Sequence, residues 1–400
     1  MSGRVTGVSR SAFNPGREGA ALPVNGMLLI TLLLLAVGLT MMTSASIEIA
    51  NGQYNDPLFH FKRQAVFSAI GLLTMLFTIN IPTRHWYAAS GLLLLLAYGL
   101  LVLVLIPGIG KVVNGSARWI DLGIFNLQPS ELGKVFLVLY LAAFMERNHD
   151  EVRNNWSGFI KPLLVIGVAV VLLQREPDHG AIVILLTAAF TMVFLAGAKL
   201  HRFLLVLAGC IAGVVLLAIK YPYVIERFTS YMNPWADEYV YGSGYQLTQA
   251  LIAFGRGEWF GVGLGNSIQK LYFLPEAHTD FVLAILAEEL GLAGVAVVLT
   301  LLSLLVFKGF SIGRGAERNG LIFQAYSAYG LSVVFASQIL INVGVNTGLL
   351  PTKGLTLPFI SYGGASLIIS CLMVGILLRI QYESEHVAAS SRSGTRKSRA

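Results

Sequence analysis

Two basic side chains beside apolar runs have the types and spacing of an anion-binding site. Arg118 follows the turn Asn114-Gly115-Ser116, and Lys134 lies three residues after Glu131 near the start of an apolar run. The arginine fork matches phosphate oxygens, and lysine supplies a point charge. We therefore expect a cationic patch for an anionic substrate group, although Glu131 and Lys134 could instead form a local ion pair on one helix face.

Acidic residues cluster at the beginning of another apolar run. Asp280 precedes this run, and Glu288 and Glu289 fall eight and nine residues later, which is about 12 Å deeper in a helix. Carboxylates at membrane depth are costly and indicate a functional site by default. Asp280 could instead cap the helix N-terminus. His278 has the setting of a solvated loop residue rather than of a metal ligand.

Two further motifs have competing interpretations. Asp178, in Arg175-Glu176-Pro177-Asp178-His179-Gly180, could cap the helix that follows. The run Gly261-Val262-Gly263-Leu264-Gly265 resembles a phosphate loop only in its glycine content, because no strand precedes it. A flexible turn beside the membrane is favoured there. Cys210 and Cys371 both lie in apolar runs and have neither disulfide nor metal-ligand spacing.

Membrane-spanning helices must position these residues. Hydrophobic residues make up 55% of the 400 and charged residues only 12%, whereas a soluble domain carries roughly 25% charged residues. A span of the hydrocarbon core needs about 20 apolar residues. The candidate spans are ten runs at 26–47, 64–80, 87–106, 129–145, 159–173, 180–198, 203–220, 281–307, 321–345 and 363–380.

The basic residues predict the orientation of these spans. With the N-terminus inside, 17 of the 28 Lys and Arg residues fall on the cytoplasmic side, as the positive-inside rule favours. We therefore predict an all-α membrane protein with ten transmembrane helices and both termini cytoplasmic. The transmembrane domain covers 24–380, with a turn-rich external segment at 107–128 and a large periplasmic loop at 221–280 between helices 7 and 8.

The two tails have little apolar sequence. The N-terminal tail at 1–23 and the basic C-terminal tail at 381–400 are rich in Ser, Gly and Arg, and we expect both to be disordered. The basic residues behind the net charge of +7 are scattered between the spans rather than gathered on one face. Their distribution therefore does not indicate nucleic acid binding.

Five motifs follow one another along the chain: Asn114-Gly115-Ser116-Ala117-Arg118-Trp119-Ile120, Gln128-Pro129-Ser130-Glu131-Leu132-Gly133-Lys134, Glu176-Pro177-Asp178-His179-Gly180, Pro275-Glu276-Ala277-His278-Thr279-Asp280-Phe281 and Leu357-Pro358-Phe359-Ile360-Ser361-Tyr362-Gly363-Gly364. Together, over about residues 24–380, they resemble the SEDS family of FtsW, RodA and SpoVE. Ala277 and the basic C-terminal tail are more similar to the FtsW branch, which acts in cell division.

The resemblance implies a peptidoglycan glycosyltransferase that polymerises lipid II at the outer face of the bacterial inner membrane, at the division septum. It implies undecaprenyl pyrophosphate as the leaving group, and as partners a class B penicillin-binding protein and other membrane proteins of the division machinery. Asp280 would then take the proton of the attacking sugar hydroxyl. Cationic residues, with or without a divalent cation such as Mg²⁺ or Mn²⁺, would stabilise the departing pyrophosphate. The substrate-binding residues implied are Arg118, Glu131, Lys134, Asp178, Glu276, His278, Glu288, Glu289 and Lys353.

Other functions fit part of the pattern. A lipid II flippase would also have many spans and intramembrane charges, although the spans show no inverted repeat. A non-catalytic scaffold of the division machinery and a RodA-like polymerase of cell elongation are the remaining alternatives. If the external motifs converge, we expect Lys134 and Asp280 to pair, because a nearby opposite charge would keep the carboxylate ionised.

Overall fold

The protein is mostly helical and crosses the membrane several times. The computed structural model describes residues 26–113, 116–121, 123, 126–206, 208–209, 231–351 and 354–397. Five of the described helices are long and apolar enough to cross a membrane: α1 (Gly26–Tyr54), α7 (Trp156–Arg175), α13 (Val282–Arg318), α14 (Ile322–Asn346) and the part of α15 (Gly364–Lys397) that runs to Ser390.

Shorter or more polar helices coincide with other expected spans. These are α2 (Phe59–Ile79), α4 (Ser90–Val104), α5 (Pro129–Arg147) and α8 (His179–Leu195). The expected span at 203–220 lies mostly outside the described residues, as does the tail at 1–23. The count of ten spans therefore stays a prediction. The remaining short helices are α3 (Thr83–Ala88), α6 (His149–Asn154), α11 (Asp237–Val240) and α12 (Tyr245–Gly257).

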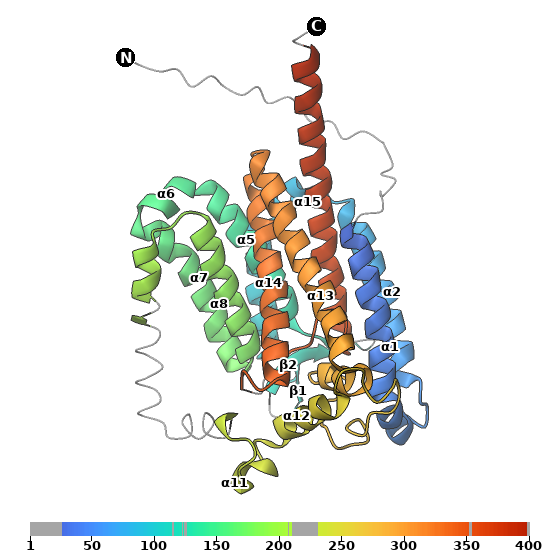
Figure 1. Ribbon diagram of the computed structural model, residues 1–400. Helices are drawn as coiled ribbons and strands as arrows, with labels where there is room; N and C mark the ends of the chain where they lie inside the picture. The colour runs from blue at the N-terminus through green and yellow to red at the C-terminus, as the bar shows by residue number, and fades with distance from the viewer. Residues whose placement is uncertain are drawn as a thin grey trace, which may run out of the picture.

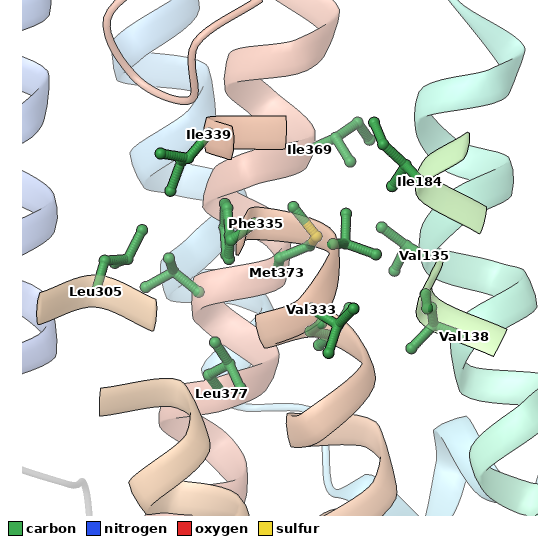
Figure 2. Close-up of a cluster of buried hydrophobic side chains, with 14 of the residues drawn as sticks. Val135, Val138, Ile184, Leu305, Val333, Phe335, Ile339, Ile369, Met373 and Leu377 are labelled. Atoms are coloured by element: carbon green, nitrogen blue, oxygen red, sulfur yellow. The ribbon is translucent and has the colours of Figure 1, made fainter. Parts of the chain in front are cut away.

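The helical bundle is tightly packed around α14. This helix packs against α13, α5 and α8, while α15 packs along α2 (Figure 1). Gly330 allows a close approach, because a Cβ atom there would lie 2.5 Å from Val138 Cγ1 and 2.7 Å from Met192 Sδ. Small residues permit such packing in membranes, where the hydrophobic effect does not drive helices together. Figure 2 shows the side chains that meet at the centre, among them Val135, Val138, Ile184, Leu305, Phe335, Ile369 and Met373.

The prediction of an all-α chain is wrong at the turn-rich segment 107–128. This segment contains a three-stranded antiparallel sheet of β1 (Gly110–Val113), β2 (Ser116–Asp121) and β3 (Asn126–Leu127), in the order β1-β2-β3. The strands are too short, and too rich in turn formers, to stand out in the sequence. The sheet lies at the end of the bundle opposite the C-terminus (Figure 1), and its hydrogen bonds fix the position of β2.

The C-terminal segment also departs from expectation. Helix α15 continues to Lys397, so residues 381–397 are helical rather than disordered. Gln381 Nε2 donates to Glu385 Oε1 at 2.7 Å, and the rings of Tyr382 and His386 lie 4.1 Å apart. Extending an existing helix is easier than nucleating one, so the preceding membrane span accounts for helix formation in this polar sequence.

Candidate active site

Asp280 lies just before α13 but does not cap it. The helix begins at Val282 with Phe281 as its N-cap residue, and no side chain caps it. The main-chain carbonyl of Asp280 instead accepts hydrogen bonds from Asn342 Nδ2 and Asn346 Nδ2, at 3.0 Å each. The capping interpretation of Asp280 is therefore wrong. Helix α14 holds the backbone of this residue and leaves its carboxylate available to the adjoining cavity.

A cavity of about 640 Å³ brings four of the five sequence motifs together. Asp280 lines it with Arg118 from β2 and Glu131 from α5. The remaining motif, Glu176–Gly180, lines a smaller cavity of about 210 Å³ through Pro177–Gly180. Ser116, Arg118 and Gly354 line both cavities. The motifs thus converge on one region, as their order along the chain alone could not show.

Arg118 lies at the boundary between these two cavities. Its Nε donates to the carbonyl oxygen of Glu176 at 3.1 Å, and its Nη2 donates to the carbonyl oxygen of Pro177. Among the described residues, it forms no ion pair with a carboxylate. The turn that follows α7 therefore orients the guanidinium without neutralising its charge, so that the charge remains available to an anionic ligand.

Asp178 has a structural role, as the capping interpretation predicted. Its Oδ1 accepts from the backbone N of Ala181 at 3.1 Å, which caps α8. Its Oδ2 accepts from Ser130 Oγ at 2.7 Å and from Gln128 Nε2 at 3.2 Å. Because Gln128 and Ser130 stand at the start of α5, Asp178 joins the N-termini of two helices and fixes the turn that holds the arginine.

Glu176 is a buried acid that sequence reasoning did not select. Neither carboxylate oxygen has a hydrogen-bond partner among the described residues. Burial, and secondarily the charge of Asp178, raise the pKa of Glu176 to about 8. Its carboxyl group is therefore mainly neutral at pH 7, and it adds little negative charge beside Arg118.

Lys134 pairs with Glu131 rather than with Asp280. Lys134 Nζ donates to Glu131 Oε1 at 2.8 Å, and both side chains are buried. No ion pair joins Lys134 to Asp280 in the part of the chain that the structure describes. The expected Lys134–Asp280 pair is therefore wrong, and the local alternative is confirmed. The i,i+3 spacing places the two groups on one face of α5, which makes this pair the easier one to form.

The carboxylate of Asp280 lies in an environment that favours its neutral form. Burial, and then the negative charge of Glu276, raise the pKa of Asp280 to about 7, while Arg118 opposes this shift. Gly354 leaves room for the group, because a Cβ atom there would lie 2.8 Å from Asp280 Oδ2. Glu276 also lines the cavity, and it accepts from Thr279 Oγ1 at 2.6 Å. A carboxylate with a pKa near the working pH suits proton transfer.

Glu288 and Glu289 lie away from this cavity and are fully buried. Glu288 accepts from Arg256 Nη1 at 2.7 Å and from the backbone N of Ile268 at 3.1 Å. Glu289 accepts from Lys270 Nζ at 2.8 Å and from Ser44 Oγ at 2.7 Å. These two acids of α13 were expected to bind substrate. The structure instead places them where they bind the segment that precedes Asp280, and Glu289 also binds Ser44 of α1.

The glycine run after α12 packs against an interruption in α13. Gly291 has a φ of 66°, which breaks the helix. Val262 N and Gly263 N donate to the carbonyl oxygens of Glu288 and Glu289 at 2.9 and 3.0 Å. These bonds satisfy carbonyl groups near the break. The first residues of the run are therefore held by backbone contacts with α13, while Leu264 and Gly265 form an exposed turn. The flexibility of this turn stays a prediction.

Aromatic and imidazole side chains complete the cavity. His278 packs against His60 and Tyr362, with ring centroids 5.1 and 5.6 Å apart, and burial lowers the pKa of His278. His60, Arg63 and Tyr362 line the cavity. Sequence reasoning missed His60 and Arg63, because isolated polar residues at the start of an apolar run give no signal of where they point. Lys353 lies outside the described residues.

The carboxylates available for a metal ion are few. No group of three or more His, Cys, Asp or Glu side chains could hold a metal ion among the residues described. Glu276 and Asp280 nevertheless line the same cavity. Because Mg²⁺ can bind through a single carboxylate together with substrate phosphates, Glu276 would suffice for a cation that enters with its substrate and would leave Asp280 free.

Comparison with known proteins agrees with the resemblance in the motifs. Residues 25–386 match the model of the FtsW/RodA/SpoVE family, described as cell cycle proteins. The chain belongs to this family. A probable peptidoglycan glycosyltransferase FtsW of Hahella chejuensis is 52% identical over 374 residues, which are 92% of this chain and 94% of that protein. A protein of the same description from Pseudomonas fluorescens is 52% identical, over 90% of this chain and 88% of its own length.

Solved structures share the fold. A chain from a study of how a peptidoglycan synthase complex coordinates polymerization and crosslinking superposes with a TM-score of 0.74, at 27% identity, over 90% of this chain and 97% of that one. The rod shape determining protein RodA of Thermus thermophilus superposes with a TM-score of 0.64, at 26% identity, over 90% of this chain and 96% of its own.

Proposed function

We propose that this protein is a peptidoglycan glycosyltransferase that polymerises lipid II, with the division-type activity of its FtsW relatives. One observation carries the proposal. Asp280, a partly buried carboxylate, lines one cavity with Arg118, which pairs with no carboxylate among the residues that the structure describes. Glycosyl transfer from a pyrophosphate donor needs a base for the attacking hydroxyl and a cation for the leaving pyrophosphate. Asp280 and Arg118 can supply these two groups in one cavity. The names of the relatives and the shared motifs support the same reaction.

The residues have complementary tasks in this reaction. The 4-hydroxyl of the acceptor sugar attacks the anomeric carbon of the donor, and its proton passes to the carboxylate of Asp280. The bond from that carbon to the undecaprenyl pyrophosphate oxygen breaks, and Arg118 stabilises the negative charge on the leaving group. Lys134 and Glu131 form a neutral pair beside this position. A divalent cation held by Glu276 together with the pyrophosphate oxygens would supply further charge for the leaving group.

The proposed setting is the bacterial inner membrane at the division septum. Ten spans would place both termini in the cytoplasm and the cavity at the outer face, where a class B penicillin-binding protein and other division proteins could receive the strands. A single cysteine at Val240, in a chain lacking Cys210 and Cys371, tests this orientation. It should react with a membrane-impermeant reagent added from outside, and labelling only from the cytoplasm would overturn the topology.

Reconstitution tests the activity. The purified protein, with its class B penicillin-binding protein and labelled lipid II, should make glycan polymer. Asp280→Asn keeps the shape of the side chain but removes its basicity, so polymer formation should fall by about 10²–10⁴-fold. Movement of lipid II across the bilayer without polymer would favour the flippase instead. Polymerisation at the wild-type rate by folded Asp280→Asn would end the assignment of the base.

A further inference from the structure

Part of the cavity wall is built from rings that the proposed reaction leaves unused. His60 of α2 and Tyr362 line the cavity, with ring centroids 4.9 Å apart and planes nearly perpendicular. His278 packs against both rings and lies two residues before Asp280. We name these three side chains the His60 cluster. It is contiguous with the turn that carries the proposed base.

The His60 cluster has hydrogen-bonding capacity that the protein does not satisfy. His60 is 6% exposed, and neither of its ring nitrogens has a hydrogen-bond partner among the described residues. The Nδ1 atom of His278 is likewise buried and without a partner. Buried polar atoms are nearly always hydrogen-bonded. Because His60 lines the cavity, its two unsatisfied ring nitrogens indicate a ligand that supplies the missing partners.

The chemistry of the cluster favours an uncharged ligand. A neutral imidazole has one donor and one acceptor, and a tyrosine hydroxyl can act as both. Phosphate oxygens at neutral pH mainly accept, so they match Arg118 better than they match these rings. Hydroxyl and acetamido groups both donate and accept, and the faces of aromatic rings attract the positively polarised C–H groups of a sugar. The wall therefore has the properties of a sugar-binding surface.

The chain is folded so that this wall and the proposed base are held together. Gln64, one turn after His60 on α2, donates through Nε2 to the carbonyl oxygen of Ser361 at 3.2 Å. The backbone N of Tyr362 donates to the carbonyl oxygen of His278 at 2.9 Å. Ser361 Oγ accepts from Leu357 N at 2.8 Å, which closes the intervening turn. The motif 357–364 thus connects α2 to the turn that ends in Asp280.

We propose that His60 and Tyr362 form the subsite for the uncharged, N-acetylated sugar whose hydroxyl attacks, and that His278 positions their rings. A hexose bound there lies in the same cavity as Asp280, which receives its proton, while Arg118 engages the pyrophosphate of the donor. The assignment rests on the proposed function for the identity of the sugar. It adds the place where the acceptor binds and the residues that recognise it.

A binding measurement tests this subsite apart from catalysis. The probe is the uncharged disaccharide of two N-acetylglucosamine residues, without lipid or phosphate, titrated against the protein in lipid nanodiscs. His60→Phe and Tyr362→Phe keep the rings but remove polar atoms, so each should weaken disaccharide binding by about tenfold, the loss of roughly one hydrogen bond. Both should bind undecaprenyl pyrophosphate within about twofold of the wild type. Arg118→Gln should instead weaken the binding of undecaprenyl pyrophosphate and leave the binding of the disaccharide largely unchanged.

Two further variants separate recognition from folding. His60→Gln restores a donor and an acceptor and should recover part of the affinity for the disaccharide. His149→Phe removes another imidazole, whose buried Nδ1 has no partner in the described part of the chain. His149 lies on α6 outside the cavity, so this variant should change neither affinity. Each variant should copurify with the penicillin-binding protein and keep its melting temperature, because a misfolded chain would lose both ligands together.

The outcomes distinguish this subsite from the proposed function. If the wild type makes no polymer but binds the disaccharide through His60, the subsite stands and the polymerase assignment fails. If the wild type polymerises lipid II while His60→Phe and Tyr362→Phe bind the disaccharide normally and keep the KM for lipid II, the subsite is wrong. Absence of disaccharide binding by an active wild-type protein also overturns it.

Discussion

Lys134 Nζ and Glu131 Oε1 lie 2.8 Å apart, and their side chains are only 2% and 6% exposed. This pair neutralises the lysine within the protein, beside a cavity that Glu131 helps to line. Arg118, held by two carbonyl oxygens, has no such partner among the described residues. The electrostatic attraction for a pyrophosphate therefore comes first from Arg118, and a phosphate that reached Lys134 would have to compete with Glu131.

Removing one member of this ion pair should destabilise the protein more than removing both members. Lys134→Met or Glu131→Gln leaves one buried charge without its partner, which costs about 3–5 kcal/mol. The double variant Glu131→Gln/Lys134→Met leaves no charge and should recover most of that loss. Denaturation of the four purified proteins, as a double-mutant cycle, measures the coupling. Additive effects of the two substitutions would show that the pair does not act as a unit.

Polymerisation should depend on pH through Asp280. Its pKa is raised to about 7, by burial first and by Glu276 second, and the base must be ionised. We expect kcat/KM to rise by about tenfold per pH unit below this value and to level off above it. Glu276→Gln removes one cause of the shift, so its profile should bend at a lower pH. An unchanged bend in that variant would place the titrating group elsewhere.

The raised pKa of Asp280 should also lower the stability of the folded protein at high pH. Its pKa rises from the ordinary 3.8 to about 7 in the folded state, so the folded protein binds this proton more tightly than the unfolded chain does. The stability that Asp280 contributes is therefore full below pH 4, falls as the pH rises, and is lost above about pH 7. Asp280→Asn escapes this loss and should melt higher than the wild type at pH 8, with a smaller difference at pH 5.

An exposed acid gives the matched control for this comparison. Asp237→Asn makes the same chemical change on α11, outside the cavity. Its melting temperature should change between pH 5 and pH 8 by about as much as that of the wild type. A lower melting temperature of Asp280→Asn than of the wild type at pH 8 would contradict the prediction. It would mean that the ionised carboxylate stabilises the fold through a partner.

The fold was predictable where it depends on local composition. Apolar runs marked helices such as α1 and α14, because lipid selects such sequences whatever their neighbours are. The sheet around Arg118 was not predictable, because its pairing joins short strands such as Gly110–Val113 and Asn126–Leu127, whose sequences indicate only turns. The helical course of α15 beyond residue 381 was missed because the tail was considered without the helix that precedes it.

The candidate site was predictable only in part, for a similar reason. The local pair Lys134–Glu131 follows from spacing along one helix. The spacing of Glu288 and Glu289 from Asp280 along one helix could be read from the sequence, but their partners Arg256 and Lys270 are distant enough in sequence that spacing could not assign them. The position of His60 beside His278 depends on how α2 packs against a turn more than 200 residues away, and only the folded chain shows it.

The break in α13 should be the most sensitive backbone position near the site. Gly291 has a φ of 66°, and a Cβ atom there would lie 2.4 Å from the backbone N of Gly261 and 2.5 Å from that of Phe260. Gly291→Ala therefore combines a strained backbone with a clash against a segment that bonds the helix on both sides of the break. We expect it to cost about 3 kcal/mol or more, and to lower the amount of folded protein in the membrane.

Gly167 provides the control, because it lies within α7 and a Cβ atom there would meet no atom within 4 Å. Gly167→Ala should leave the melting temperature unchanged or raise it slightly, since alanine favours a helix over glycine by about 1 kcal/mol. Thermal denaturation of both variants beside the wild type measures the difference. Equal stability of Gly291→Ala and Gly167→Ala would mean that the chain tolerates a continuous α13.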